Sequence, residues 1–294
     1  MNPRPVFRGS IPALVTPMHE DGSVDVTTFQ ALLDWHVSEG SDAVVVAGTT
    51  GEASTLGIEE QFDLVKTACR HLNGRLPVIA GTGANSTAEA VELARLAQKA
   101  GAQAHLSVVP YYNKPGQNGI IAHFQAVAEA CELPMILYNV PGRTVADIAN
   151  DTVLALAETP NIIGIKDATG DMGRGFDLLC RRPSGFQVFS GDDETALALT
   201  MLGGDGVISV TANAFPRIMH LMMADACRGS MQSARDWNAK LQEMHRALFV
   251  EPNPAPLKWI LARHGKLKNM LRLPLVPLSE IYEPRLVQLL EEIG

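Results

Sequence analysis

The sequence predicts a (β/α)8 barrel, also called a TIM barrel, followed by a C-terminal all-helical extension. Short apolar runs rich in Val and Ile recur along the chain, and each is followed by a helical pattern. This alternation is typical of a parallel sheet whose strands are joined by crossover helices. Eight such runs in series fit a closed barrel. The runs are residues 11–18, 43–50, 77–83, 104–112, 134–141, 162–169, 186–193 and 206–213.

The length and the C-terminal pattern indicate two domains. A chain of 294 residues accommodates one barrel of roughly 250 residues and an extension. We predict that residues 1–228 form the barrel that carries the active site and that residues 229–294 form the extension. Only helical spacing continues in the second part, over residues 231–250, 253–264 and 283–293. The linker at residues 251–256 is short and rich in proline, so we expect the extension to pack against the barrel.

A doubly wound sheet that binds a nicotinamide cofactor is the alternative fold. It requires a glycine-rich phosphate loop of the form G-x-G-x-x-G after the first strand. Residues 18–22 read MHEDG, which does not fit this pattern. Residues 81–85 read GTGAN and lack the third glycine. The sequence therefore favours the barrel.

Composition argues against several classes of partner. A formal net charge of −8 and the absence of long basic runs disfavour a nucleic-acid surface. We find neither a secretory signal pattern nor a stretch of about 18 apolar residues, so we expect a cytoplasmic protein without a membrane span. The eight histidines show no ligand spacing such as H-E-x-x-H, so we expect no metal.

Lys166 is the candidate nucleophile. It lies in the sixth apolar run, and strand alternation places it on the same face as Ile162 and Gly164. That face is the interior of the barrel if Ile163 and Ile165 face the helices. An interior lysine is disfavoured as an ammonium ion, and its free amine attacks ketones to form a Schiff base. The alternative is a strand-end lysine in a salt bridge, and the residue pattern alone leaves both interpretations open.

Hydroxyl-bearing residues stand at the ends of other predicted strands, where barrels of this type build their active sites. Thr49 and Thr50 follow the second run between glycines, and free backbone N–H groups there could bind a carboxylate. The alternative is a tight turn that needs glycine for its geometry alone. Tyr111, Tyr112 and Tyr138 also stand at strand ends, either as groups that transfer protons or as an aromatic cap on the core.

Arg143 lies in the loop after the fifth run. A planar guanidinium at this place could hold a carboxylate through two parallel hydrogen bonds. An ordinary surface arginine is the alternative.

Several of these segments together carry a resemblance to a known family. Nearly the whole chain resembles the dihydrodipicolinate synthase family, which belongs to a superfamily of pyruvate lyases that includes N-acetylneuraminate lyase. The ordered series of motifs is more specific than any single one. It consists of GTTGEAST (48–55), AGTGAN (80–85), PYYNKP (110–115), YNVPGRT (138–144), GIKDATG (164–170), SGDD (190–193), GVISVTAN (206–213) and PNPAPLKW (252–259).

The resemblance implies roles for individual residues. Lys166 matches the Schiff-base lysine, and Tyr138 matches the phenol beside it that shuttles protons. Thr49 and Tyr112 match the other members of the hydroxyl relay, with Tyr112 inserted from a neighbouring subunit. The resemblance therefore implies a homo-oligomer, at least a dimer and by expectation a tetramer. Thr50 matches the group that binds the carboxylate of pyruvate.

Three further positions match residues around the substrates in that family. Gly191 and the carbonyl of Ile208 match positions that line the pocket. Arg143 matches the residue that receives the carboxylate of aspartate semialdehyde, whereas the sialic-acid lyases lack this arginine. The resemblance thus implies condensation of pyruvate with L-aspartate 4-semialdehyde to 4-hydroxy-tetrahydrodipicolinate, an early step of diaminopimelate and lysine biosynthesis.

This chemistry needs no added cofactor, because the lysine itself supplies the electron sink. The nearest alternative is a related pyruvate aldolase or dehydratase that takes another aldehyde or sugar acid. A nicotinamide-dependent oxidoreductase, or a barrel that binds a small acid without turnover, needs no buried lysine.

A regulatory site is the last feature that the resemblance implies. In lysine-inhibited members of the family, the effector is contacted by residues that match Asn85, Glu89 and Tyr111. Two histidines of that site correspond here to Ile58 and Gln61. We therefore predict weak or absent feedback inhibition by L-lysine.

Overall fold

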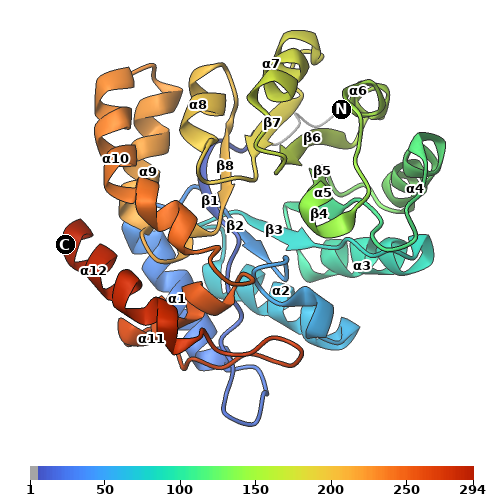
Figure 1. Cartoon of the computed structure of the whole chain (residues 1–294). Helices are drawn as coiled ribbons and strands as arrows, with labels where there is room; N and C mark the ends of the chain where they lie inside the picture. Colours follow the sequence, from blue (N-terminus) through green and yellow to red (C-terminus); the bar gives the residue numbers. More distant parts are fainter. Residues whose placement is uncertain (1–5) are drawn as a thin grey trace.

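The computed structural model describes residues 6–294 and contains a closed barrel of parallel strands. Eight strands pair in the order β1-β8-β7-β6-β5-β4-β3-β2. A parallel bridge between Ala13 and Val45 joins the two ends of the sheet, and Leu14 N donates to Val45 O at 2.9 Å. The predicted barrel is confirmed (Figure 1). The strands are β1 (Gly9–Pro12), β2 (Val44–Val46), β3 (Val78–Gly81), β4 (Ala104–Val108), β5 (Met135–Asn139), β6 (Ile162–Asp167), β7 (Gln187–Ser190) and β8 (Gly206–Ser209).

The strands are shorter than the apolar runs that predict them. Each run continues beyond the C-terminal end of its strand into the loop above the barrel. The first predicted run, residues 11–18, also begins two residues after the start of its strand, because β1 spans Gly9–Pro12. These loops form the face on which the candidate site lies.

Helices surround the barrel, and several begin and end at residues with clear capping roles. Asp25 accepts a hydrogen bond from Thr28 N at the start of α1, and Gly40 ends this helix with φ 85°. Asp171 caps α7 in the same way. The helices of the barrel are α1 (Val26–Glu39), α2 (Ile58–Leu72), α3 (Thr87–Ala100), α4 (Gln117–Ala130), α5 (Pro141–Thr144), α6 (Asn150–Ala157), α7 (Met172–Arg181), α8 (Ala196–Met201) and α9 (Pro216–Cys227), with short turns η1 (Ala53–Thr55) and η2 (Thr211–Asn213).

Strand β6 differs from the simple alternation expected of it. Ile163 lies in the core cluster inside the barrel, whereas Ile162 and Ile165 pack in a cluster with the surrounding helices. The expectation that Ile162 shares the face of Lys166 and that Ile163 faces outward is therefore wrong. A register shift in the pairing of β5 with β6 inserts one extra residue at Ile163, which is a β-bulge.

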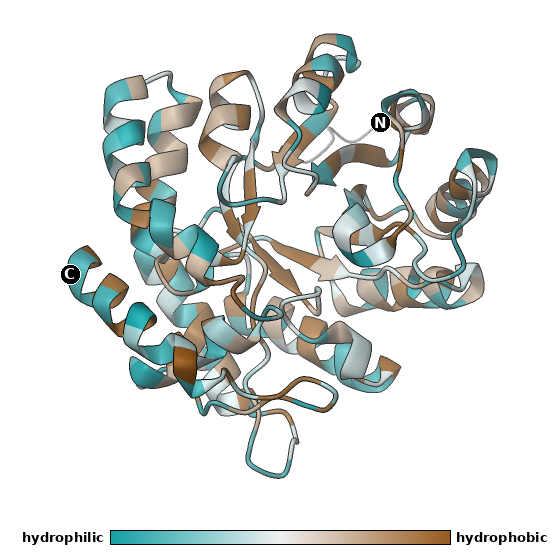
Figure 2. Cartoon of the chain, viewed as in Figure 1, coloured by the Kyte–Doolittle hydropathy of each residue, from teal (hydrophilic) through white to brown (hydrophobic). Residues whose placement is uncertain are grey.

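The C-terminal extension packs on the barrel beside α1 and α9. It consists of α10 (Met231–Ala247), α11 (Ala255–Arg263), η3 (Glu280–Tyr282) and α12 (Glu283–Ile293), close to the helical segments predicted. The boundary predicted after residue 228 falls between α9 and α10. Figure 2 shows hydrophobic strands at the centre and hydrophilic residues on the outer helices, including α10 and α12. Across residues 6–294, no helix is both long and apolar enough to span a bilayer.

Candidate active site

A cavity of about 380 Å³ opens among the C-terminal ends of the strands. It extends from the interior of the barrel past the loops that follow β2 to β5. Seven residues predicted from the sequence line it, from six different segments of the chain. They are Thr49, Thr50, Glu89, Tyr111, Tyr138, Arg143 and Lys166.

Lys166 lies inside the barrel next to Tyr138. Its side chain is buried, and Nζ is 4.3 Å from the centre of the Tyr138 ring. The two residues are direct partners across β5 and β6, which fixes their separation. Asp167, the adjacent carboxylate, faces Arg174 instead, with 3.8 Å between Oδ2 and Nε. The amine is thus placed beside a phenol in a cavity large enough for a small substrate.

Gly191 packs directly against Lys166, although it does not line the cavity itself. A Cβ atom at this position would lie 2.7 Å from Cε of Lys166 and 2.7 Å from Cβ of Ala168. Only glycine leaves room for the lysine in this conformation. Ile208 is fully buried in the core cluster inside the barrel, and it also lies outside the cavity lining.

The turn after β2 brings Thr49 to the rim of the cavity and buries Thr50. Thr50 Oγ1 accepts a hydrogen bond from Asn253 Nδ2 at 3.0 Å. Asn253 belongs to the extension and stands 203 residues further along the chain. The glycine after the pair is needed for close packing, because a Cβ at Gly51 would lie 2.9 Å from the carbonyl of Leu14. The packing of Gly51 gives this glycine a structural role in the turn, and the carboxylate site expected at Thr49 and Thr50 stays a prediction.

A buried ion pair is a second link between this turn and the extension. Lys258 Nζ lies 2.5 Å from Glu52 Oε1, and both side chains are fully buried. Lys258 also donates to Met270 O at 2.7 Å, and Glu52 Oε2 accepts from Arg272 N at 3.0 Å. Burial lowers the pKa of Lys258, and the neighbouring Glu52 opposes this shift. The motif PNPAPLKW contains the lysine, but nothing in the sequence marks Glu52 as its partner.

Arg143 stands at the mouth of the cavity. It lies on the single turn α5, its side chain is exposed, and it lines the cavity together with Val140 and Thr144. Of the two cationic side chains that line the cavity within the described residues, Lys166 is thus buried and Arg143 is exposed.

The three residues proposed for the regulatory site also lie close together. Burial and the nearby Glu89 carboxylate raise the pKa of Tyr111, and a hydrogen bond with the backbone of Asn85 opposes them. Tyr111 and Glu89 line the outer part of the cavity. The matching position Gln61 is already committed to the backbone, since its Nε2 donates to Ala53 O at 3.0 Å and to Leu56 O at 3.2 Å.

Tyr112 does not line this chain's own cavity. Its side chain is 87% exposed, and its backbone has φ 72°, in the left-handed region that a bulky residue rarely adopts. Of the two adjacent tyrosines, Tyr111 therefore lines the cavity and Tyr112 does not.

The fold and the site together define a class I aldolase, in which a lysine inside a (β/α)8 barrel forms a Schiff base with a carbonyl substrate. The sequence profile of the dihydrodipicolinate synthetase family matches residues 6–293, and the chain belongs to this family. The 4-hydroxy-tetrahydrodipicolinate synthase of Nitrosospira multiformis is 60% identical over 98% of this chain and 96% of its own length.

Solved structures of dihydrodipicolinate synthases are also similar to this chain in sequence and in fold. The chloride-inhibited dihydrodipicolinate synthase from Acinetobacter baumannii, complexed with pyruvate, is 51% identical with a TM-score of 0.97. The match covers 98% of this chain and 99% of that one. The enzyme from Cyanidioschyzon merolae with lysine bound is 38% identical with a TM-score of 0.95, over 98% of each chain.

Proposed function

We propose that this protein is a 4-hydroxy-tetrahydrodipicolinate synthase, which condenses pyruvate with L-aspartate 4-semialdehyde. The observation that carries the proposal is the buried amine of Lys166 beside the phenol of Tyr138, in a cavity that Arg143 borders. Membership of the family and the relatives' printed names support the same activity. Because this reaction is a step of diaminopimelate and lysine biosynthesis, we propose that the protein acts in the cytoplasm.

The first half-reaction loads pyruvate onto the enzyme. The Lys166 amine attacks the ketone of pyruvate, and loss of water leaves an imine. Tyr138 transfers the protons of this step. Thr49 and Tyr112, which reaches in from a neighbouring subunit, complete the hydroxyl relay. The turn at Thr50 binds the pyruvate carboxylate. Deprotonation of the methyl group then gives the nucleophilic enamine.

The second half-reaction uses the aldehyde. The enamine carbon attacks the aldehyde carbon of aspartate semialdehyde, and the aldehyde oxygen takes a proton to become the 4-hydroxyl. The amino group of the substrate then displaces the Lys166 amine from the imine, which closes the ring and frees the enzyme. Arg143 holds the carboxylate of the semialdehyde at the mouth of the cavity.

Reduction of the Schiff base tests this function. Borohydride treatment with pyruvate should add one reduced pyruvyl group to the protein, detected by mass spectrometry. Lys166→Ala should abolish both the adduct and turnover, because the variant lacks the amine that forms the Schiff base. An adduct that persists in this variant would contradict the assignment. A screen of aldehydes, with wild type and Arg143→Ala side by side, separates the synthase from an aldolase that takes another aldehyde.

We further propose that Tyr112 acts in the cavity of a second subunit. Its exposed phenol and its left-handed backbone suit a residue that reaches outward into a partner. On this proposal the active site is complete only in a homo-oligomer, a dimer at least and a tetramer by expectation.

A further inference from the structure

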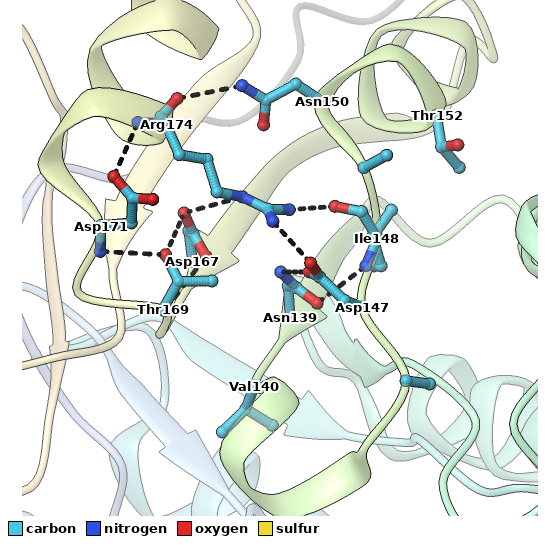
Figure 3. Close-up of polar contacts among 12 residues, drawn as sticks. Asn139, Val140, Asp147, Ile148, Asn150, Thr152, Asp167, Thr169, Asp171 and Arg174 are labelled. Carbon is cyan, nitrogen blue, oxygen red and sulfur yellow. Dashed lines mark hydrogen bonds and ion pairs between the residues drawn. The ribbon is translucent and has the colours of Figure 1, made fainter.

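Behind the catalytic pair, on the outer face of the barrel, Figure 3 shows a polar network that includes the side chains of Asn139, Asp147, Asp167 and Arg174. Tyr138 and Lys166 point inward, so their neighbours Asn139 and Asp167 point outward toward the helices. Asn139 and Asp167 are also direct partners across β5 and β6. Both are buried. The same strand ends therefore carry the catalytic residues inside and this network outside.

Asn139 ties the loop after β5 back onto the strand. Its Nδ2 donates to Asp147 Oδ1 at 2.8 Å, and its Oδ1 accepts from Ile148 N at 3.0 Å. One buried amide thus closes the segment 140–147 into a loop. Arg143 stands at the centre of this loop, above the cavity.

Arg174 holds the same loop from the side of α7. Its Nη1 donates to Asp147 Oδ2 at 2.8 Å, its Nη2 donates to the carbonyl of Ile148, and its Nε faces Asp167 Oδ2 at 3.8 Å. Burial raises the pKa of Asp167, and the Arg174 guanidinium opposes that shift. The arginine joins the loop that bears Arg143 to the strand that bears Lys166.

The loop needs such support, because its backbone is strained. Val145 has φ 62° and an exposed side chain. A β-branched residue rarely adopts this left-handed conformation, and it persists only where the surroundings hold it. Inside the loop, Thr144 Oγ1 donates to Ala146 O at 2.8 Å. From outside the loop, Gln117 Nε2 donates to Asp147 O at 2.8 Å. The side chains of Asn139 and Arg174 also act on Asp147 or on Ile148, and they alone bind the Asp147 carboxylate among the described residues.

We infer that Asp147, held between Asn139 and Arg174, is a positioning residue for Arg143 and thereby sets the affinity for the carboxylate of the second substrate. The inference rests on the proposed function, in which Arg143 receives that carboxylate. Asp147 touches no substrate and acts through the geometry of the loop. Its removal should affect the aldehyde step and leave the loading of pyruvate on Lys166 intact.

A double-mutant cycle tests this role. Asp147→Ala should raise the KM for aspartate semialdehyde by about tenfold, while the rate of the borohydride-trapped pyruvyl adduct stays at the wild-type level. In an Arg143→Ala background, the same change should have no further effect on that KM. Asp147→Asn, which keeps an acceptor for Asn139 and loses the ion pair with Arg174, should fall between wild type and Asp147→Ala.

A matched control comes from an ion pair between α6 and α7, next to the loop. Asp151 on α6 is exposed and pairs with Arg181 on α7, away from the loop. Asp151→Ala should leave the KM unchanged. Thermal unfolding of every variant separates a local effect from loss of the fold.

The outcomes are distinct. An unchanged KM in Asp147→Ala, or an undiminished effect in the Arg143→Ala background, overturns the inference and leaves the proposed function standing. A wild-type KM in Arg143→Ala overturns the proposed role of Arg143 and the inference with it. Absence of a pyruvyl adduct in the wild type overturns the proposed function itself.

Discussion

Gly191 shows how closely the residues around Lys166 are packed. The glycine touches neither the cavity nor, on the proposed mechanism, the substrate, yet a Cβ there would lie 2.7 Å from Cε of the lysine. Single residues of this kind set the position of the reactive amine. The sequence motif SGDD points to the glycine, but the reason for it is visible only in the packing.

At the residue scale we predict that Gly191→Ala slows formation of the pyruvyl adduct by about 10- to 100-fold, because the added methyl displaces the reactive amine. The rate of adduct formation with pyruvate and borohydride measures this effect. Gly116→Ala is the control, since a Cβ at Gly116 meets nothing within 4 Å. A normal rate in Gly191→Ala would show that the lysine adapts without loss.

Gln61 leads to a second prediction at this scale, on feedback inhibition by L-lysine. Its amide donors already bond to Ala53 O and Leu56 O, and Ile58 offers no side-chain hydrogen bond. Loss of one hydrogen bond to an effector weakens its binding by roughly 0.5–1.5 kcal/mol, so we expect no inhibition by sub-millimolar lysine in a steady-state assay. An Ile58→His/Gln61→His double variant should gain sensitivity. Inhibition of the wild type at such concentrations would contradict the prediction.

At the scale of elements, the strands and helices can be predicted from the sequence, whereas the bulge in β6 and the side-chain contacts between elements cannot. The apolar runs mark the strands because burial on both faces demands continuous Val and Ile. The bulge at Ile163 leaves no such mark, since one inserted residue keeps the run apolar. The partners of Asp147 are equally hidden, because Asn139 and Arg174 read as ordinary polar residues until the loop and α7 come together.

The extension supplies a prediction about an element. Lys258→Met leaves the carboxylate of Glu52 buried without a cation and should lower the free energy of unfolding by about 3–5 kcal/mol. The neutral pair Glu52→Gln/Lys258→Met should be less destabilised than Lys258→Met alone, because no uncompensated charge remains. Urea unfolding of the variants measures both effects. Strictly additive losses would show that the two residues do not interact.

For the molecule as a whole, the residue pattern predicts the family fold, whereas the homo-oligomer is an expectation that only the family resemblance implies. Eight βα units, the buried lysine and the ordered motifs lead to the barrel and to the candidate residues at its strand ends. A subunit interface has no comparable signal in one sequence, because its residues resemble other surface residues. Tyr112 is our candidate for such an interface, and its exposure and left-handed backbone are visible only in the structure.

Subunit mixing tests the whole assembly. Lys166→Ala and Tyr112→Phe should each be nearly inactive alone. In a mixed dimer, one site combines an intact lysine with the partner's intact tyrosine, so random re-association should restore about a quarter of the wild-type activity. If both residues served the same subunit's site, mixing would restore nothing. Mixing each variant with itself is the control.

The contact between Asn253 and Thr50 affects the order in which the nascent chain can complete its structure during translation. The turn that contains Thr50 and Glu52 emerges from the ribosome long before Asn253 is synthesised, because Asn253 stands 203 residues after Thr50. Nascent chains fold from the N-terminal side as they emerge. Here, however, the turn gains its hydrogen bond with Asn253 and its ion pair with Lys258 only after these two residues have been synthesised. On the proposed function, in which this turn binds the carboxylate of pyruvate, we therefore expect the nascent chain to become catalytically competent only after the extension has been synthesised.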